Sequence, residues 1–538
     1  MLLAVLSAVW LNLPFPIAGP LPQWRAVFGW FALLPLLYAL LAQQNVSSPS
    51  YVRRSTIIAY VCGAVWYLLN CYWIYQTMTQ YAQGVSSLGG VGILFLFSAI
   101  LGLYFGVFGL VIAWVRRASG GILAPLVLAP FLWTALELAA ARITSVPWDQ
   151  LGYSQVDNLL LTRLAPFAGT YGISFVLVAV NGMLASALLA KSIHTQLRIG
   201  VGAALLIIIL QLGSFMTAKP APTSTYAVLL QPDLDVGTNN VWIGPEWDNR
   251  ANWMLAQSLD TCTPAYIGVP SPRAPLILPP CAKNTLPPGV VVWPEAQSPF
   301  FSDDPRLIAL LHSLATTTHA PIVAGMLGRD QTGTYNSAVF TAPNGTILGR
   351  YDKIHLVPFG EYIPYRNALF FAHKLTQQLV DLQRGKTRNV FRSDGHAFGI
   401  FICYESIFAD EVRQFAQNGA NVFINISDDG WYGNTSAPWQ HLNMARMRAI
   451  ENHRWILLDT NNGITTAIDP RGRITDSAPR DVETSLVVRY GYENNLTFYT
   501  RYGDVFAYLC GIIVVGALLF LAFKRRPAYR TSQVSTSC

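Results

Sequence analysis

Long apolar runs constrain this chain more than any other feature of its sequence. Eight of them lie near residues 2–19, 27–43, 56–75, 89–115, 121–141, 165–190, 199–217 and 504–523. A helix that crosses the hydrocarbon core of a membrane needs about 20 mostly apolar residues. The first run has neither a basic segment before it nor a small-residue cleavage site, so we interpret it as a span rather than a signal peptide. The sequence therefore predicts eight transmembrane helices.

Charged residues are distributed unevenly along the chain. They make up 12% of it, whereas soluble domains typically contain about 25%. Most lie in the stretch between the seventh and eighth runs, at ordinary globular density. We therefore predict a seven-helix membrane domain at 1–220, a soluble catalytic domain at 221–500, an eighth span at 501–525 and a tail at 526–538. The net charge of +7 comes without a dense basic stripe interleaved with aromatics, so no nucleic-acid partner is expected.

The positions of Lys and Arg predict the orientation in the membrane. The loops after spans two, four and six and the final tail carry ten of them: Arg53, Arg54, Arg116, Arg117, Lys191, Arg198, Lys524, Arg525, Arg526 and Arg530. The alternate loops carry only Arg25, Arg142 and Arg163. Basic loops remain in the cytoplasm. Both termini are therefore expected in the cytoplasm and the soluble domain outside it.

The soluble segment has the alternating pattern of an α/β domain. Predicted strands lie at 225–230, 290–293, 321–325, 337–341, 398–402 and 421–425, and predicted helices at 242–259, 304–316 and 436–453. Asn344-Gly345 predicts a hairpin turn that leads into a further strand before Lys353, and a closing hairpin is expected around 469–472. The predicted fold is thus a membrane helix bundle joined to an α/β domain.

Cys403 ends a predicted apolar strand and begins a predicted turn into a helix. The partial positive charge of a helix N-terminus favours a thiolate, and backbone N–H groups at such a turn can stabilise an oxyanion. The alternative is a small apolar residue of the core, which is the commoner fate of a free cysteine. The local pattern does not decide between the two.

Glu295 and Lys353 each follow a predicted strand. Glu295 lies in a Trp-Pro-Glu sequence, where partial desolvation suits a general base, although a surface loop is the alternative. Lys353 offers an ammonium for an oxyanion, although an isolated loop lysine is usually solvated. Glutamate, lysine and cysteine occur in this order, each just after a strand of one domain, and together they indicate a catalytic constellation.

On these residues, the soluble segment resembles the nitrilase superfamily, whose members carry a Glu-Lys-Cys triad on an αββα sandwich. The chain as a whole resembles the apolipoprotein N-acyltransferase family. The further matching stretches are Val146–Gln155, Pro438–His441, Met444–Ala449 and Thr460–Thr465.

The resemblance implies a role for nine residues. Cys403 would be the nucleophile, Glu295 the general base and Lys353 the oxyanion stabiliser. Glu361, Tyr404 and Glu405 match positions that support activity, and Trp148, Trp247 and Asn336 match positions near the substrate. Interfacial anchoring or core packing is the alternative for each tryptophan. For Glu137, inside the fifth run, we favour a structural hydrogen bond to a neighbouring helix.

The resemblance also implies the reaction. A phospholipid would donate its sn-1 acyl chain to Cys403, and the α-amino group of a diacylglyceryl-cysteine at a lipoprotein N-terminus would accept it. The expected setting is a monomer in the bacterial inner membrane, with a periplasmic catalytic domain. The alternatives are a membrane-anchored amidase, an acyltransferase with another acceptor, and a transporter or receptor with an inactive nitrilase domain.

The seven cysteines show no CxxC pair and no spacing with histidine that suits zinc, so neither a metal nor another cofactor is expected. Two features depart from the family pattern. Cys262 and Cys281 lie in a proline-rich segment without a recognised counterpart, and an oxidising compartment would allow a disulfide between them. Asp428-Asp429-Gly430-Trp431 differs from the usual Asn-Asp-Ala-Trp run, which leaves the shape of that loop open.

Overall fold

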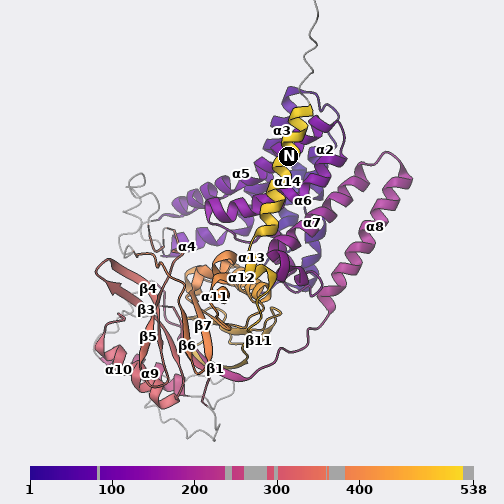
Figure 1. Cartoon of the computed structure of the whole chain (residues 1–538). Coiled ribbons are helices and arrows are strands. Elements are labelled where there is room, and N and C mark those ends of the chain that lie inside the picture. Colours follow the sequence, from indigo (N-terminus) through magenta and orange to yellow (C-terminus); the bar gives the residue numbers. More distant parts are fainter. Residues whose placement is uncertain are drawn as a thin grey trace, which may run out of the picture.

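The computed structural model describes residues 1–81, 85–236, 245–259, 287–295, 301–358, 360–362 and 382–524, with the side chains of 245–248 excepted. A helical part and an α/β part lie against each other (Figure 1). The helical part contains α1 Leu2–Asn12, η1 Gln23–Trp30, α2 Leu34–Leu41, α3 Pro49–Asn70, α4 Trp73–Tyr81, α5 Ser87–Ser119, α6 Leu123–Ala139, α7 Ala165–Leu189, α8 Ile193–Gln211 and α14 Val505–Lys524.

The number of membrane spans differs from the predicted eight. Among the described residues, six helical segments are long and apolar enough to cross a membrane, and the bent pair α3 and α4 would make a seventh. The first predicted span is helical only from Leu2 to Asn12, because Pro14 and Pro16 follow and cannot continue a helix. Eleven residues rise only about 16 Å, which is too short for a hydrocarbon core of about 30 Å.

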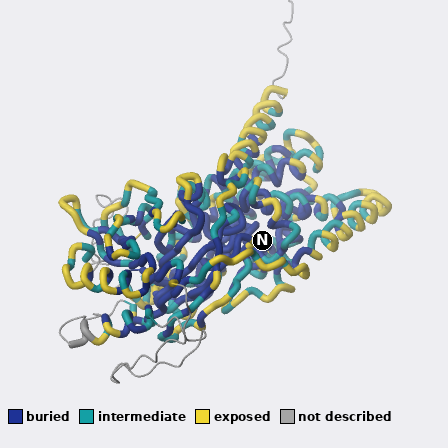
Figure 2. Tube along the Cα trace, turned by 60° about the horizontal axis from the view of Figure 1, so that its bottom comes forward, coloured by how far each residue is buried: buried dark blue, intermediate teal, exposed yellow. Residues whose placement is uncertain are grey.

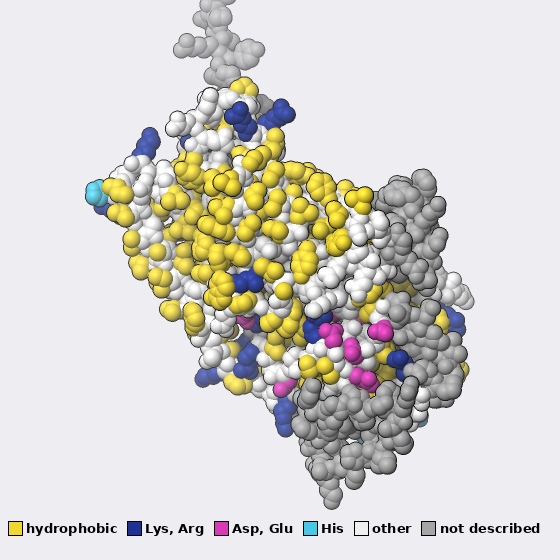
Figure 3. Space-filling model, turned by 180° about the vertical axis from the view of Figure 1, so that it is seen from behind, with side chains coloured by type: hydrophobic (Ala, Val, Ile, Leu, Met, Phe, Trp, Pro, Cys, Tyr) yellow, Lys and Arg dark blue, Asp and Glu magenta, His cyan; other side chains and the backbone are white. Residues whose placement is uncertain are grey.

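The outer surface of the helical part is apolar. Large side chains such as Phe95 of α5, Leu205 of α8 and Phe520 of α14 are more than half exposed. Figure 3 shows a broad hydrophobic surface on one face of the helical part, and Figure 2 shows exposed residues along the outlying helices around a buried interior. Helices satisfy their own backbone hydrogen bonds, so such a surface suits contact with lipid rather than water.

The α/β part consists of two six-stranded sheets in the orders β12-β1-β2-β3-β4-β5 and β11-β10-β9-β8-β7-β6. The strands are β1 Thr225–Gln231, β2 Val290–Trp293, β3 Ile322–Asp330, β4 Gly333–Thr341, β5 Ile347–Asp352, β6 Val390–Ser393, β7 His396–Ile402, β8 Val422–Ser427, β9 Ile456–Thr460, β10 Thr466–Ile468, β11 Ile474–Ser477 and β12 Thr484–Tyr490. Helices α9 Pro245–Leu259 and α10 Pro305–Thr318 cover the first sheet, and α11 Ala409–Gln417 and α12 Ala437–Asn452 cover the second.

Alternation along the strands separates two apolar layers. In β1, Ala227 and Leu229 pack into the core shared with the second sheet, whereas Val228 and Leu230 pack against α9 and α10. All predicted strands are present, together with β6, β9 and β12, which were not predicted. The sandwich places the carboxyl ends of β2 and β7, one from each sheet, where side chains from both can meet.

Helix α12 joins the α/β part to the membrane part. Gln440 donates to the carbonyl oxygens of Pro16 and Asn70 at 3.1 Å each, and Trp148 donates to Gln440 at 2.8 Å. Farther along α12, Arg448 donates to the Tyr153 hydroxyl at 3.0 Å. The second sheet and its helices therefore rest directly on the ends of the membrane helices.

Candidate active site

Cys403 lies at the turn from β7 into the short helix η7 Cys403–Ile407, where the strand-to-turn transition was predicted. Its φ of +50° is a left-handed conformation, which costs a non-glycine residue about 1–2 kcal/mol. The side chain is only 6% exposed. A strained, buried cysteine at the end of an interior strand is held there by its surroundings, as is common for functional residues.

Glu295, Lys353 and Glu361 form one buried cluster. The Lys353 ammonium lies 3.0 Å from Oε1 of Glu295 and 3.0 Å from Oε1 of Glu361. Asn336 donates to the same two oxygens at 2.6 and 2.7 Å. The second oxygen of Glu295 accepts from the Asp428 backbone at 2.8 Å. Every described partner of Glu295 is a donor, so this side chain is placed as a carboxylate.

The charges of this cluster act on Cys403. Burial raises the pKa of the Cys403 thiol well above its ordinary value, the Glu295 carboxylate raises it further, and Lys353 opposes them. Burial alone would lower the pKa of Lys353, but Glu295 and Glu361 outweigh it, so the net shift is well upward. The resting site therefore holds a thiol beside a carboxylate and an ammonium.

These shifts predict how Cys403 reacts with iodoacetamide. Because the thiolate is the reactive form, the free enzyme should be alkylated more slowly at neutral pH than a model thiol, whose pKa is about 8.5. The rate should still rise between about pH 8 and 9. Mass spectrometry of the Cys403 peptide follows the reaction, and a rate that levels off below pH 8 would contradict a raised pKa.

Glu405 connects the segment after β5 to the turn that begins at Cys403. The side chain is fully buried. It accepts from the backbone of Ile354 and His355 at 2.6 and 3.0 Å, and from that of Ile402 at 2.7 Å. Burial raises the pKa of Glu405, while these backbone donors oppose the rise. Glu405 thus fixes the residues next to both Lys353 and Cys403.

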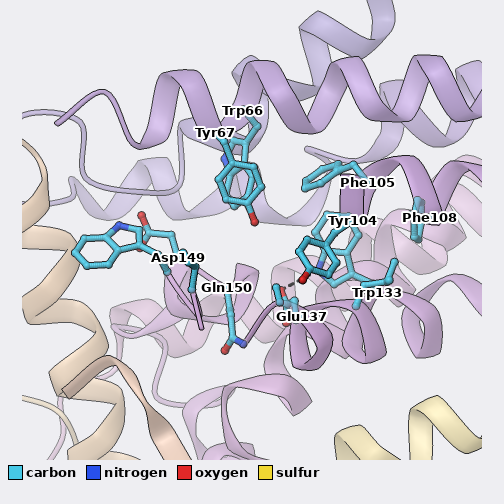
Figure 4. A pocket seen from close by; sticks show the side chains of 13 residues that line it. Trp66, Tyr67, Tyr104, Phe105, Phe108, Trp133, Glu137, Asp149 and Gln150 are labelled. Atoms are coloured by element: carbon cyan, nitrogen blue, oxygen red, sulfur yellow. Dashed lines mark hydrogen bonds between the residues drawn. The ribbon is translucent and has the colours of Figure 1, made fainter. Parts of the chain in front are cut away.

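The residues on the membrane side lie next to a pocket. The Tyr404 hydroxyl donates to the carbonyl oxygen of Ser145 at 3.0 Å. Trp148, 3% exposed, lines a pocket formed mainly by aromatic side chains: Trp66, Tyr67, Tyr104, Phe105, Phe108 and Trp133, with Leu136, Glu137, Ala140, Val146, Asp149 and Gln150. Figure 4 shows Tyr67, Tyr104 and Phe105 facing this pocket.

Other predicted residues are placed as follows. Asn336 contacts the two carboxylates described above. Glu137 accepts from Trp133 on its own helix at 2.9 Å and from the Leu151 backbone at 2.8 Å, so its hydrogen bonds stabilise the local structure. The Trp247 side chain and the cysteines Cys262 and Cys281 lie outside the described residues.

Two residues of the site had no predicted role. His441 and Asp429 are fully buried and lie behind Cys403, with His441 Nε2 3.2 Å from the Cys403 carbonyl oxygen. His441 was part of a matching stretch, and Asp429 of a loop whose shape was left open. The sequence around a histidine on a buried helix does not indicate which backbone group the side chain will contact.

Comparison with known proteins supports one family. Residues 7–183 match the apolipoprotein N-acyltransferase N-terminal domain, and residues 245–490 match the carbon-nitrogen hydrolase family. The apolipoprotein N-acyltransferase of Geobacter metallireducens is 33% identical, covering 98% of this chain and 95% of that protein. That of Methylococcus capsulatus is 29% identical, covering 90% of each. Similarity over nearly the full length of both proteins shows that this chain is an acyltransferase of the apolipoprotein N-acyltransferase family.

Proposed function

We propose that this chain transfers the sn-1 acyl chain of a phospholipid to the α-amino group of an N-terminal diacylglyceryl-cysteine, in two steps through a thioester on Cys403. The observation that carries this proposal is the cluster of Lys353, Glu295 and Glu361, whose charges act on the buried thiol of Cys403.

In the first step, Sγ of Cys403 attacks the ester carbonyl of the lipid. Glu295 accepts the thiol proton as the bond forms, because a thiol with a raised pKa is a weak nucleophile until it is deprotonated. Lys353 and a backbone N–H stabilise the oxyanion, and each such donor contributes about 100-fold or more in rate. Glu295 then returns the proton to the leaving glycerol oxygen, and the acyl thioester remains.

In the second step, the amine of the acceptor attacks the thioester. Glu295 removes the excess proton from the incoming nitrogen, the same oxyanion donors act again, and the thiol is restored when the amide forms. A thioester is reactive enough for attack by an amine, whereas direct aminolysis of a lipid ester lacks this activated intermediate.

The membrane part supports the choice of substrates. An acyl chain would enter the aromatic pocket beside Trp148, because apolar walls favour burial of hydrocarbon by about 25 cal/mol per Å². Tyr404, the residue after Cys403, is bonded to the loop that carries Trp148 and so connects the nucleophile to the wall of this pocket. Two lipid-anchored substrates would reach such a site without leaving the bilayer.

The basic loops support the placement of the enzyme. With ten Lys and Arg residues on one side of the membrane and three on the other, the C-terminal tail would lie in the cytoplasm and the 221–500 domain in the periplasm. We also propose that the chain acts as a monomer in the inner membrane. A cysteine introduced at Thr332, in an exposed turn of the first sheet, should react with a membrane-impermeant maleimide in intact spheroplasts. Labelling only after lysis would contradict this orientation.

A transfer assay tests the proposed function. Purified enzyme in vesicles receives a phospholipid with a labelled sn-1 chain and a synthetic diacylglyceryl-cysteinyl peptide, and mass spectrometry follows the peptide. We expect a mass increase of one acyl chain with the wild type and none with Cys403→Ala. Release of free fatty acid at the same rate with and without peptide would instead indicate a hydrolase, and would overturn the proposal.

A further inference from the structure

His441 on α12 and Asp429 at the start of the short helix η8 Asp429–Tyr432 form a buried pair behind the nucleophile. Nδ1 of His441 lies 3.2 Å from Oδ1 of Asp429. Nε2 lies 2.6 Å from the Ser406 hydroxyl and 3.2 Å from the Cys403 carbonyl oxygen. Neither side chain takes part in the proton transfers described above.

The partners of His441 favour its protonated form. The Cys403 carbonyl oxygen and the Asp429 carboxylate both accept, so an imidazolium, which donates from both ring nitrogens, satisfies both contacts, and the Ser406 hydroxyl can accept from Nε2 as well. Burial alone would lower the pKa of His441 and raise that of Asp429, but their mutual attraction outweighs burial in both, so the pKa of His441 is raised and that of Asp429 is lowered. An imidazolium facing two acceptors satisfies this geometry.

The Cys403 carbonyl is held from a second direction as well. Nδ2 of Asn425, on β8, lies 3.5 Å from it. Asp429 is in turn fixed by the Ser427 hydroxyl at 2.7 Å. Together these contacts hold the peptide that follows Cys403, whose left-handed conformation would otherwise relax.

Because a trans peptide is planar, its C=O and N–H point in opposite directions. With the Cys403 carbonyl directed at His441 on α12, the Tyr404 N–H points away from α12, which covers the outer face of the second sheet. Lys353 and Glu295 reach the thiol from the first sheet, on the opposite side. The Tyr404 N–H is also one of the first of η7, and such groups have no partner within their helix.

From this arrangement we infer that His441, braced by Asp429, is a positioning residue that holds the Tyr404 N–H as the second oxyanion donor beside Lys353. The inference rests on the proposed thioester mechanism. It adds that His441 touches no reacting atom and serves only steps that form an oxyanion.

The test compares two reactions of the same cysteine. Acylation by p-nitrophenyl butyrate forms an oxyanion, whereas alkylation by iodoacetamide does not, and neither requires the lipid substrates to be known. In His441→Leu, we expect acylation to slow by about 100-fold, the usual effect of losing one oxyanion donor, and alkylation to change less than about threefold. In His441→Gln, the amide N–H can still donate to the carbonyl. Acylation of this variant should therefore be at least tenfold faster than acylation of His441→Leu.

His453→Gln, at the end of the same helix and 42% exposed in its side chain, is the matched control and should leave both rates unchanged. Equal losses of acylation and alkylation would show a general structural role and overturn the inference, as would no loss of either. If His441→Leu does not fold, Asp429→Asn and His441→Gln provide the same comparison of rates. Failure of lipid transfer in the wild type, with acylation by the ester intact, would refute the proposed substrates but not this inference.

Discussion

Glu295→Gln is expected to lower the rate of acyl-enzyme formation by about 10³-fold, within the usual range for a general base. The amide keeps the size of the side chain but cannot accept the thiol proton, and the raised pKa of Cys403 leaves the nucleophile protonated. The rate is measured with a fluorescent phospholipid in the absence of acceptor, by the appearance of labelled enzyme on a gel.

Glu361→Gln is the control for this prediction. Glu361 makes the same contacts with Lys353 and Asn336 as Glu295 does, so a loss caused only by a weakened ion pair would be similar in both variants. The second oxygen of Glu361 instead accepts from the Val357 backbone at 2.8 Å. We therefore expect Glu361→Gln to lower the rate of acyl-enzyme formation at least tenfold less than Glu295→Gln does. Equal losses would contradict the assignment of Glu295 as the base.

Lys353→Met should affect both rate and stability. Removal of the ammonium takes away one oxyanion donor, which should slow acylation by about 10²–10³-fold. It also leaves Glu295 and Glu361 as neighbouring buried carboxylates, and breaking a buried ion pair in this way typically costs about 3–5 kcal/mol. Because the pKa of Lys353 is raised by folding, its contribution is present throughout the neutral range and is lost only as pH rises through that higher value.

The midpoint of thermal unfolding in detergent measures the second effect. The double variant Lys353→Met with Glu361→Gln should recover part of the lost stability, since one of the two repelling carboxylates is then neutral, while activity stays low. If the double variant is less stable than Lys353→Met alone, the described charge balance of the cluster is wrong.

The sequence was informative where local chemistry decides the structure. β2 and β7 are short apolar strands, and β5 follows a hairpin turn. The residues after these three strands, Glu295, Cys403 and Lys353, are placed by the strand ends. Alternation and turn residues predict such positions without knowledge of the tertiary structure. Because each of the three residues follows a strand of the same domain, the sequence suggested that they form one site. The structure places the Lys353 ammonium 3.0 Å from the Glu295 carboxylate.

The features that were missed depend on tertiary contacts. Strand β12 pairs with β1, although nearly the whole domain lies between them in sequence. The role of His441 depends on the direction of a single carbonyl group, which no periodicity encodes. The length of the first predicted span was wrong for a local reason. The prediction considered only the apolar composition of the segment and not Pro14 and Pro16, which end its helix after Asn12.

The central claim is that Cys403 carries the acyl chain between the two substrates. The most direct measurement is the intact mass of the enzyme after incubation with phospholipid alone, followed by addition of the diacylglyceryl peptide. The account predicts an increase of one acyl chain that is sensitive to hydroxylamine, is absent in Cys403→Ala, and disappears as the peptide gains the same mass. Full transfer to the peptide without any acylated enzyme, when both are sampled on the time scale of a single turnover, would contradict it.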